Sequence, residues 1–375
     1  MNKSVFYPLK LLSASIRLIR CNQRSIPFEK YDTIYVTSLM NQYIEKRLEA
    51  NDLPDEWNLL AENYFQKREF LIYIEKYNPC VQRYYCLFEH DKLLAAAIMY
   101  SLRLDLFTYL RIKSPLKMNI AGIPCSVSSS GIFGRKDSKE QLKDYIFSNE
   151  KGFVLFLNLD EKPLQETSAT GKTLPTILLK NTFKSWEEYL VHLRSDYRRR
   201  LQKIARTSSG TELIKTDCSV FDKEMYRQYL QVYSKSAAKL EKLSFSFLKK
   251  LPPEFHLVAC RKNGQTIGWN ILLKSDRTLF FFLGGIDYQQ NAENQTYLKL
   301  LTNIVAEGIA QGVDLIDLGQ TAEIPKIRLG GQPQTKYMEA RHSNPFFHRL
   351  LKFSEKSLEY KKQIPNHHVM KEINL

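Results

Sequence analysis

The second half of the chain carries a succession of helical and strand patterns that limits its fold. Apolar residues recur at three- or four-residue spacing after Ser185 and again within 221–236, as on the buried face of a helix. Two apolar runs then flank Asn263-Gly264, a residue pair that favours the tight turn of a β-hairpin. A third apolar run, 278–286, is followed by a helical pattern and a last strand pattern. We therefore predict a mixed α/β fold in which helices cover a mostly antiparallel, twisted sheet.

The first half has a related design, although its sequence does not repeat that of the second. Short helical patterns at 56–60 and 70–77 precede two apolar runs that flank a turn at 90–92. The run 153–159 is continuously apolar, which is typical of a strand inside a sheet. This half should therefore also form a sheet flanked by helices.

A polar, turn-rich stretch at 162–175 separates the halves and is the predicted linker. It contains Gly-Lys-Thr at 171–173, but a phosphate-binding P-loop would need a further glycine at position 166, which is Glu166. The predicted organisation has four segments: a basic leader (1–28), an N-terminal domain (29–165), a C-terminal domain (174–345) and a basic tail (346–375).

Positive charge is concentrated in two places. The chain has 55 Lys and Arg against 40 Asp and Glu, a net charge of +15. Within 194–206, Arg199, Lys203 and Arg206 share the helix face opposite the apolar stripe, where a row of one sign repels itself. A second basic concentration spans 326–362. Both favour an anionic partner: a phosphate-bearing cofactor, a tRNA or an anionic lipid surface. The alternative is a solvated helix face with a basic tail.

The leader, the cysteines and the apolar runs bear on location. Residues 1–28 contain five basic side chains and no acid, which predicts a transit-like peptide, a membrane-surface helix or an irregular leader. The six cysteines form no Cys-x-x-Cys pair and no cluster with zinc-ligand spacing, so we expect no metal and a reducing compartment. The longest apolar run, 93–100, is far shorter than the roughly 20 residues of a membrane span. We expect a cytoplasmic protein, or one peripheral to the inner face of a membrane.

Three motifs occur in order in the second half. The first has two parts, Ser-Trp-Glu-Glu-Tyr-Leu from Ser185 and Leu-Arg-Ser-Asp-Tyr-Arg-Arg-Arg-Leu from Leu193. The second is Gly-Val-Asp-Leu-Ile-Asp-Leu-Gly from Gly312. The third is Lys-Ile-Arg-Leu-Gly-Gly from Lys326. Together they resemble FemABX-like acyltransferases, a tandem-domain branch of the GNAT superfamily. The resemblance covers about 180–345 and implies two GNAT-like domains that transfer an acyl or aminoacyl group to an amine.

The resemblance also implies the partners. Family donors are aminoacyl-tRNA and acyl thioesters, and the acceptors are cell-wall precursors, lipids or small amines, which suggests a role in the cell envelope. The donor here would be acyl-CoA, an acyl carrier thioester or aminoacyl-tRNA. Asn291, Asn294 and Gln295, with Arg199 and Lys203, are the predicted contacts to this cofactor.

One departure from the superfamily pattern concerns coenzyme A. Conventional acetyltransferases bind its pyrophosphate with a glycine-containing loop, whereas this chain has Gln-Gln-Asn-Ala-Glu-Asn at 289–294. Without glycine, close approach of the backbone is harder, and Glu293 would repel a diphosphate. Aminoacyl-tRNA or a carrier-bound acyl group is therefore favoured over acetyl-CoA.

Group transfer to an amine needs a proton acceptor, stabilisation of the carbonyl oxygen and a grip on both substrates. Asp287 and Asp317, at the ends of predicted strands, are the candidate catalytic carboxylates; the alternatives are a turn cap for Asp287 and an ion pair for Asp317. The substrate-binding candidates are Lys326, Arg328, Gly330 and Gly331, with surface charge as the alternative for the two cations. The serine-rich loop 126–130 is a further candidate for acceptor contacts.

Two non-catalytic interpretations remain open at this stage. The first is a nucleic-acid-binding module built on the basic helix. Such a module usually interleaves exposed aromatic residues with its cations, whereas Trp186 and Tyr197 lie on the apolar stripe. The second is a membrane-surface protein held by the basic leader.

Overall fold

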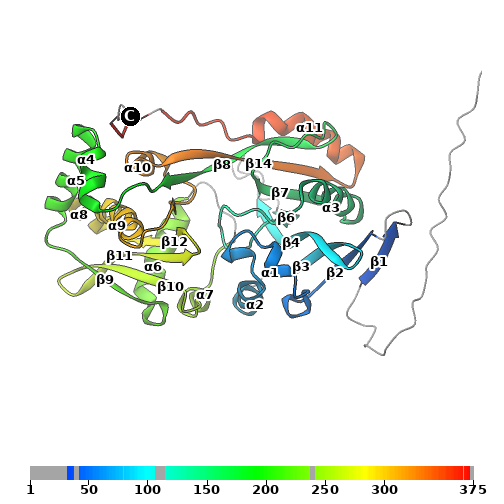
Figure 1. Ribbon diagram of the computed structural model, residues 1–375, viewed down its shortest axis with the longest axis horizontal. Coiled ribbons are helices and arrows are strands. Elements are labelled where there is room, and N and C mark those ends of the chain that lie inside the picture. Colours follow the sequence, from blue (N-terminus) through cyan, green and yellow to red (C-terminus); the bar gives the residue numbers. More distant parts are fainter. Residues whose placement is uncertain are drawn as a thin grey trace, which may run out of the picture.

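A computed structural model describes residues 32–37, 42–78, 80–105, 115–236, 241–365 and 367–371. The predicted leader lies outside these residues. Within them, fourteen strands form one sheet in the order β1-β2-β3-β4-β5-β7-β14-β8-β13-β12-β11-β10-β9, with β6 paired to β4 (Figure 1). Only the β5–β7 and β12–β13 pairs are parallel. The predicted class, a mostly antiparallel sheet flanked by helices, is confirmed.

The first half contributes the strands from β1 to β7 and the helices packed on them. Their bounds are β1 (Asp32–Thr37), β2 (Gln42–Arg47), η1 (Ala50–Asp52), α1 (Trp57–Leu60), η2 (Tyr64–Gln66), α2 (Arg68–Tyr77), β3 (Gln82–Glu89), β4 (Lys92–Asp105), β5 (Pro115–Ala121), β6 (Ile132–Gly134), α3 (Lys136–Asn149) and β7 (Phe153–Leu159). The β3–β4 turn has His90 and Asp91 at positive φ, the backbone of a two-residue hairpin.

The second half contributes the remaining elements. Their bounds are β8 (Ala169–Lys180), α4 (Trp186–His192), α5 (Ser195–Thr207), β9 (Glu212–Asp217), η4 (Cys218–Val220), α6 (Lys223–Lys235), α7 (Phe245–Lys249), β10 (Phe255–Lys262), β11 (Gln265–Ser275), β12 (Thr278–Ile286), α8 (Tyr288–Asn294), α9 (Thr296–Ala310), β13 (Leu315–Asp317), α10 (Glu323–Ile327), β14 (Gln332–His342) and α11 (Pro345–Leu358). The hairpin predicted at Asn263-Gly264 joins β10 and β11.

The two halves share one sheet through β14. This strand pairs with β8 on one side and with β7 of the first half on the other. Strand β8 begins at Ala169, so the second part of the expected linker is already sheet. Only the residues between the end of β7 at Leu159 and the start of β8 at Ala169 lie outside the sheet at this crossing. The predicted domain boundaries at 165 and 174 stay a prediction.

The long helix expected after Ser185 is instead two helices, α4 and α5. Its start is as predicted, because the N–H of Glu188 donates to Ser185 Oγ at 3.1 Å. The helix ends because Leu193 forms a β-bridge with Met370, and the N–H of Arg194 donates to Val369 O at 3.0 Å. A bridge partner 177 residues away along the sequence, Met370, thus interrupts a pattern that is locally helical.

The glycine-free stretch at 289–294 is helical. Residues 288–294 form α8, and Gln295, at φ = 47°, connects it to α9. A single left-handed residue, rather than a glycine-rich loop, therefore joins the two helices.

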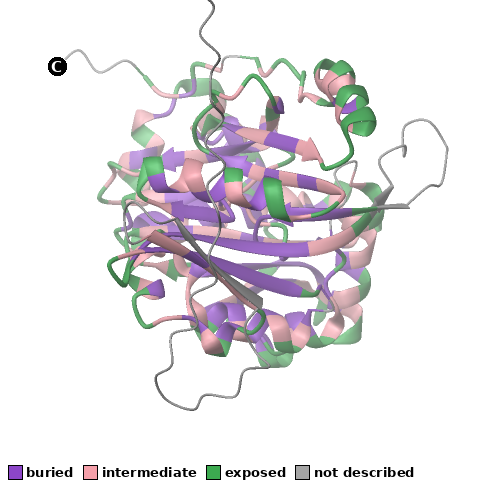
Figure 2. Cartoon of the chain, turned by 90° about the vertical axis from the view of Figure 1, so that its right-hand side faces the viewer, coloured by how far each residue is buried: buried purple, intermediate pink, exposed green. Residues whose placement is uncertain are grey.

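A shared aromatic core fixes the halves against each other. The rings of Phe70 and Phe255 are stacked at 5.6 Å, and those of Phe65 and Phe282 at 5.8 Å. Buried residues follow the strands through the middle of the molecule in Figure 2. The five cysteines in the described part of the chain are all buried thiols. No helix in this part is long and apolar enough to cross a membrane.

Candidate functional site

The parallel strands β12 and β13 separate after a short paired stretch. Thr278–Phe280 pair with Leu315–Asp317, where β13 ends. Within the described residues, the rest of β12, Phe281–Ile286, has no strand beside it on that side. Its edge can therefore bind an extended ligand by backbone hydrogen bonds.

A cavity of about 1030 Å³ occupies this divergence. Strand β12 bulges at Phe282, because Leu283 pairs with Ile271 while Phe281 already pairs with Leu272. The bulge bends β12 and widens the gap beside it, as is common next to active sites.

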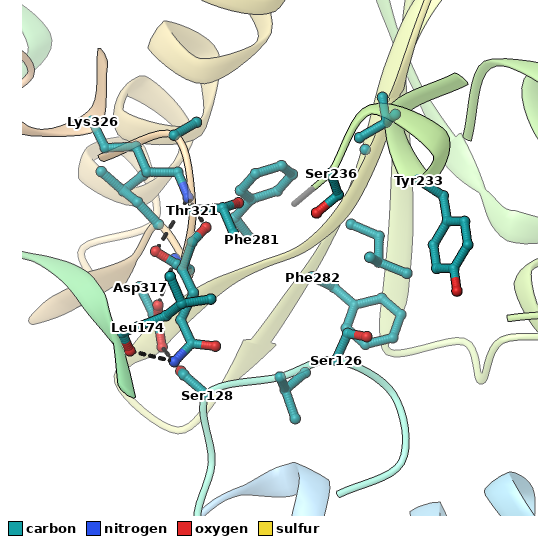
Figure 3. A pocket seen from close by; sticks show the side chains of 18 of the residues that line it. Ser126, Ser128, Leu174, Tyr233, Ser236, Phe281, Phe282, Asp317, Thr321 and Lys326 are labelled. Atoms are coloured by element: carbon teal, nitrogen blue, oxygen red, sulfur yellow. Dashed lines mark hydrogen bonds between the residues drawn. The ribbon is translucent and has the colours of Figure 1, made fainter. Parts of the chain in front are cut away.

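The cavity lies between the two halves, and both supply its walls. The first half contributes the serine-rich loop with Ser126 and Ser128, together with Asn158. The second half contributes the edge of β12, the end of α6, the start of α9 and the segment 317–322 with Lys326 (Figure 3). Residues 357–361, at the end of α11, complete the rim.

Asp317 is a buried carboxylate on the cavity wall. It is 9% exposed; the N–H of Gly319 donates to its Oδ1 at 2.7 Å, and Ser128 Oγ lies 3.4 Å from Oδ2. Burial raises the pKa of Asp317, and the opposing effects of the Gly319 N–H and of Lys326 do not cancel it. When ionised, this carboxylate is therefore a stronger base than a solvated aspartate.

Lys326 is a buried lysine on the same wall. Its side chain is inside the molecule at 2% exposure, and Nζ donates to Gly319 O at 3.1 Å and to Gln320 O at 2.6 Å. Nζ also lies 5.6 Å from the centre of the Phe281 ring. Burial lowers the pKa of Lys326 to about 7, although Asp317 opposes this shift. Since an ammonium has three N–H donors, one is left for a ligand oxygen.

The turn between Asp317 and Lys326 is strained. Thr321 and Ala322 have φ of 60° and 46°, and such left-handed backbone costs roughly 1–2 kcal/mol per non-glycine residue. Gly319, at φ = 72°, takes the same conformation without that cost. Gln320 Nε2 donates to Asn158 Oδ1 at 3.0 Å, which ties the turn to the first half. The turn thereby holds the carbonyls that position the Lys326 ammonium.

The other predicted catalytic carboxylate, Asp287, is placed differently. Its Oδ1 accepts from the N–H of Gln289 at 2.9 Å and caps α8. It is not among the residues that line the cavity. The structure thus brings together Asp317 and Lys326 but not Asp287, and a catalytic role for Asp287 stays a prediction.

Of the three predicted cofactor contacts near α9, one lines the cavity. Asn291 does so, and its Oδ1 accepts from the N–H of Tyr297 at 2.9 Å. Asn294 is buried and donates to Gln290 O at 3.0 Å, while Gln295 is the left-handed link described above.

A second, basic cavity of about 510 Å³ lies along α5. Its lining is Asp196, Tyr197, Arg199, Arg200, Lys203, Arg206, Arg328 and His367, and we call it the α5 groove. Burial and the nearby Arg328 lower the pKa of Arg200, so these like charges are close. The predicted contacts Arg199, Lys203 and Arg328 thus share one groove. Lys326, on α10, lines the main cavity instead, although Arg328 directly follows the same helix.

The two predicted glycine contacts line neither cavity. Gly330, at φ = 92°, has a left-handed backbone that favours glycine. A Cβ on Gly331 would lie 2.5 Å from Ile177 Cγ2, so close packing favours glycine there. The part of these two glycines in substrate binding stays a prediction.

One feature was missed at the level of sequence. The carboxylate of Glu323 on α10 accepts from Tyr360 Oη at 2.7 Å and from Lys362 Nζ at 2.6 Å. These bonds fasten the chain after α11 over the helix that carries Lys326. No spacing rule links residues so far apart, whereas the serine-rich loop was recognisable from its composition. In the described ranges, no group of His, Cys, Asp and Glu could hold a metal ion.

Comparison with known proteins gives likenesses of architecture. No family model matches the sequence, and no curated protein matches it. The structure is similar to that of FemX (TM-score 0.46, 8% identity, 75% of this chain and 92% of that one). It is also similar to a tandem GNAT protein from the clavulanic acid biosynthesis pathway (0.47, 10%, 80% and 99%) and to L-PGS from Bacillus licheniformis (0.40, 12%, 71% and 87%).

Proposed function

We propose that this protein transfers an acyl or aminoacyl group from an activated carrier to an amine. The observation that carries this proposal is the buried pair Asp317 and Lys326 on one wall of a cavity between diverging parallel strands. A buried acid and a buried cation with oppositely shifted pKa values are costly for stability and typical of a reacting site.

The chemistry follows from these two groups. The carbonyl carbon of the donor ester or thioester is attacked by the amine, and the carbon–oxygen or carbon–sulfur bond to the carrier breaks. Asp317, ionised, accepts the proton that the attacking nitrogen loses and returns it to the departing oxygen or sulfur, so that the carrier leaves as its alcohol or thiol. Lys326, protonated, donates its remaining N–H to the carbonyl oxygen as negative charge develops there. The free edge of β12 holds the acyl arm in line with both groups.

The carrier is proposed to bind through its phosphates. The α5 groove presents Arg199, Arg200, Lys203, Arg206 and Arg328 against Asp196 alone. Lys326 on α10 lines the main cavity, and Arg328, the residue that follows α10, lines this groove. A polyanionic carrier held in the groove could thus present its acyl end to the cavity.

The identities of the donor and of the acceptor are also proposed. Helix α8 occupies the stretch where a glycine loop would bind a pyrophosphate, which favours aminoacyl-tRNA or a carrier-bound acyl group over acetyl-CoA. The acceptor would be an amine of a cell-wall precursor, a lipid or a small molecule, in a cytoplasmic reaction of envelope biosynthesis. The basic helix as a purely nucleic-acid-binding module is less well supported, because it leaves the buried Asp317 and Lys326 without a role.

We expect the full chain to form an amide when it is given a labelled donor and a cell extract as the source of amines. Labelled aminoacyl-tRNA and labelled acyl-CoA are supplied separately, and the product is treated with mild alkali. An amide survives this treatment, whereas the donor ester or thioester does not. Alkali-stable label from one donor class identifies the carrier. A labelled acyl carrier thioester is supplied in the same way, and if none of the three donors yields such a product in any extract fraction, the proposed reaction is wrong.

We expect the double variant Arg199→Ala, Lys203→Ala to weaken carrier binding and to reduce its salt dependence. Each lost phosphate contact should lower the slope of log affinity against log salt by about one. Arg227→Ala is the matched control, because Arg227 is an exposed helical arginine on α6 that pairs with Glu224, as Arg199 pairs with Asp196. An unchanged slope in the double variant would place the carrier elsewhere.

A further inference from the structure

Helix α11 carries a row of large apolar side chains that point into solvent. Phe346, Leu350 and Phe353 are 72%, 54% and 88% exposed, and Phe347 beside them is 51% exposed. Their spacing of three and four residues places them on one side of the helix. In a helix whose only role is to cover a sheet, large apolar residues are buried against the sheet. Their exposure on α11 therefore indicates an interaction surface.

The opposite side of α11 is already occupied. Leu351 is buried against Ala169 and Ala340 of the sheet. His348 Nε2 lies 2.8 Å from Thr167 O, and Lys352 Nζ donates to Ser168 O at 2.9 Å. One face of α11 is therefore packed against the sheet and the segment before β8, and the opposite face exposes the phenylalanines to solvent.

The charge around this face is positive. Residues 345–362 contain five Lys and Arg and two Glu. Arg349 and Lys356 are exposed on α11 itself, next to the apolar row, and Lys361 is exposed just beyond the helix. An apolar face with a basic border is the arrangement that binds the interface of an anionic bilayer. A partner helix or a second copy of this chain would instead need acidic side chains that pair with these basic residues.

The same helix ends at the mouth of the main cavity. Residues 357–361 line that cavity, and Tyr360 and Lys362 bond Glu323 on α10. Whatever α11 rests on therefore lies close to residues that line the cavity of Lys326. A bilayer at this position would bring membrane-embedded molecules to the cavity mouth.

We propose that α11 docks this protein on the surface of an anionic lipid bilayer, with the rim of the main cavity turned toward the membrane. Phe346, Leu350 and Phe353 insert at the level of the headgroups, and Arg349 and Lys356 contact lipid phosphates. The docking does not depend on the proposed transfer reaction. Together with that reaction, it restricts the acceptor to an amine on a membrane-bound molecule.

The test is co-sedimentation of the full chain with lipid vesicles. Vesicles of phosphatidylcholine with about 30% phosphatidylglycerol are compared with pure phosphatidylcholine, because the electrostatic part needs anionic lipid. We expect Phe346→Ser, Phe353→Ser to lower binding to the anionic vesicles at least about tenfold. Neutralising Arg349 or Lys356 should lower it about fivefold each. Leu59→Ser is the control, since Leu59 on α1 is 85% exposed and Figure 1 shows α1 far from α11.

Three results would overturn the proposal, and none depends on transfer activity. The first is that the wild-type chain does not sediment with anionic vesicles. The second is that the double phenylalanine variant binds as well as the wild type, which would assign membrane contact to another segment, such as the basic leader. The third is that the wild type forms a dimer that the double variant dissolves, without binding vesicles. Unchanged melting temperatures of the variants show that they are folded.

Discussion

Lys326→Met should reduce group transfer by about 100-fold or more while leaving the protein folded, because it removes the donor proposed for the carbonyl oxygen. Methionine has a similar length and fills the same buried space, so loss of activity would not reflect a cavity. The measurement is the rate of amide formation, with thermal unfolding in parallel. Lys223→Ala, an exposed lysine at the start of α6, is the control and should keep full activity.

The stability of the same variant carries a distinct signature. Burial lowers the pKa of Lys326 to about 7 in the folded protein, whereas a lysine in the unfolded chain titrates near 10.4. Between these values the unfolded chain binds a proton that the folded protein does not. The unfolding free energy of the wild type should therefore rise with pH from about 7 to about 10, relative to Lys326→Met. A pH-independent difference between the two proteins would show that Lys326 titrates normally.

Asp317→Asn should lower the transfer rate by about 100-fold or more, because the amide cannot accept the proton of the attacking amine. Asparagine keeps the size of the side chain and can still accept the N–H of Gly319 through its oxygen. The variant should therefore fold normally. If it retains most of the activity, the proton goes elsewhere, and Asp287 becomes the next candidate.

The pH profile of the wild type tests both groups together. Activity requires Asp317 ionised and Lys326 protonated. Burial raises the pKa of the first above its ordinary value and lowers that of the second to about 7. The rate should thus rise through the titration of Asp317 and fall about tenfold per pH unit well above pH 7. The residual rate of Asp317→Asn should lose the acid limb and keep the alkaline one.

Elements with a strong local signal were predictable from the sequence. The Asn263-Gly264 turn, the helix that begins after Ser185 and the continuous apolar strand 153–159 each form where the residues indicated. In each case the determining interactions lie within a few residues of one another. Such signals gave the fold class and located the basic face of α5, whose cations now line one groove.

Two features that the sequence did not indicate depend on segments far apart in the chain. The helix after Ser185 breaks because Leu193 and Arg194 bond the chain near Met370, at the other end of the protein. Strand β14 joins the two halves into one sheet because it pairs with β7, a strand from the other half. Local spacing contains no information on either contact.

The candidate site divides in the same way. The sequence by itself determined which chemical groups are present: an aspartate at the end of a strand, a lysine before two glycines and a serine-rich loop. Only the tertiary structure decided that Asp317 and Lys326 share a cavity wall, that Arg328 faces a different groove and that Asp287 serves as a helix cap. The physical reason is twofold. Burial shifts the pKa values of Asp317 and Lys326, and the divergence of β12 from β13 leaves space for the cavity. Both are properties of packing between segments far apart in the chain.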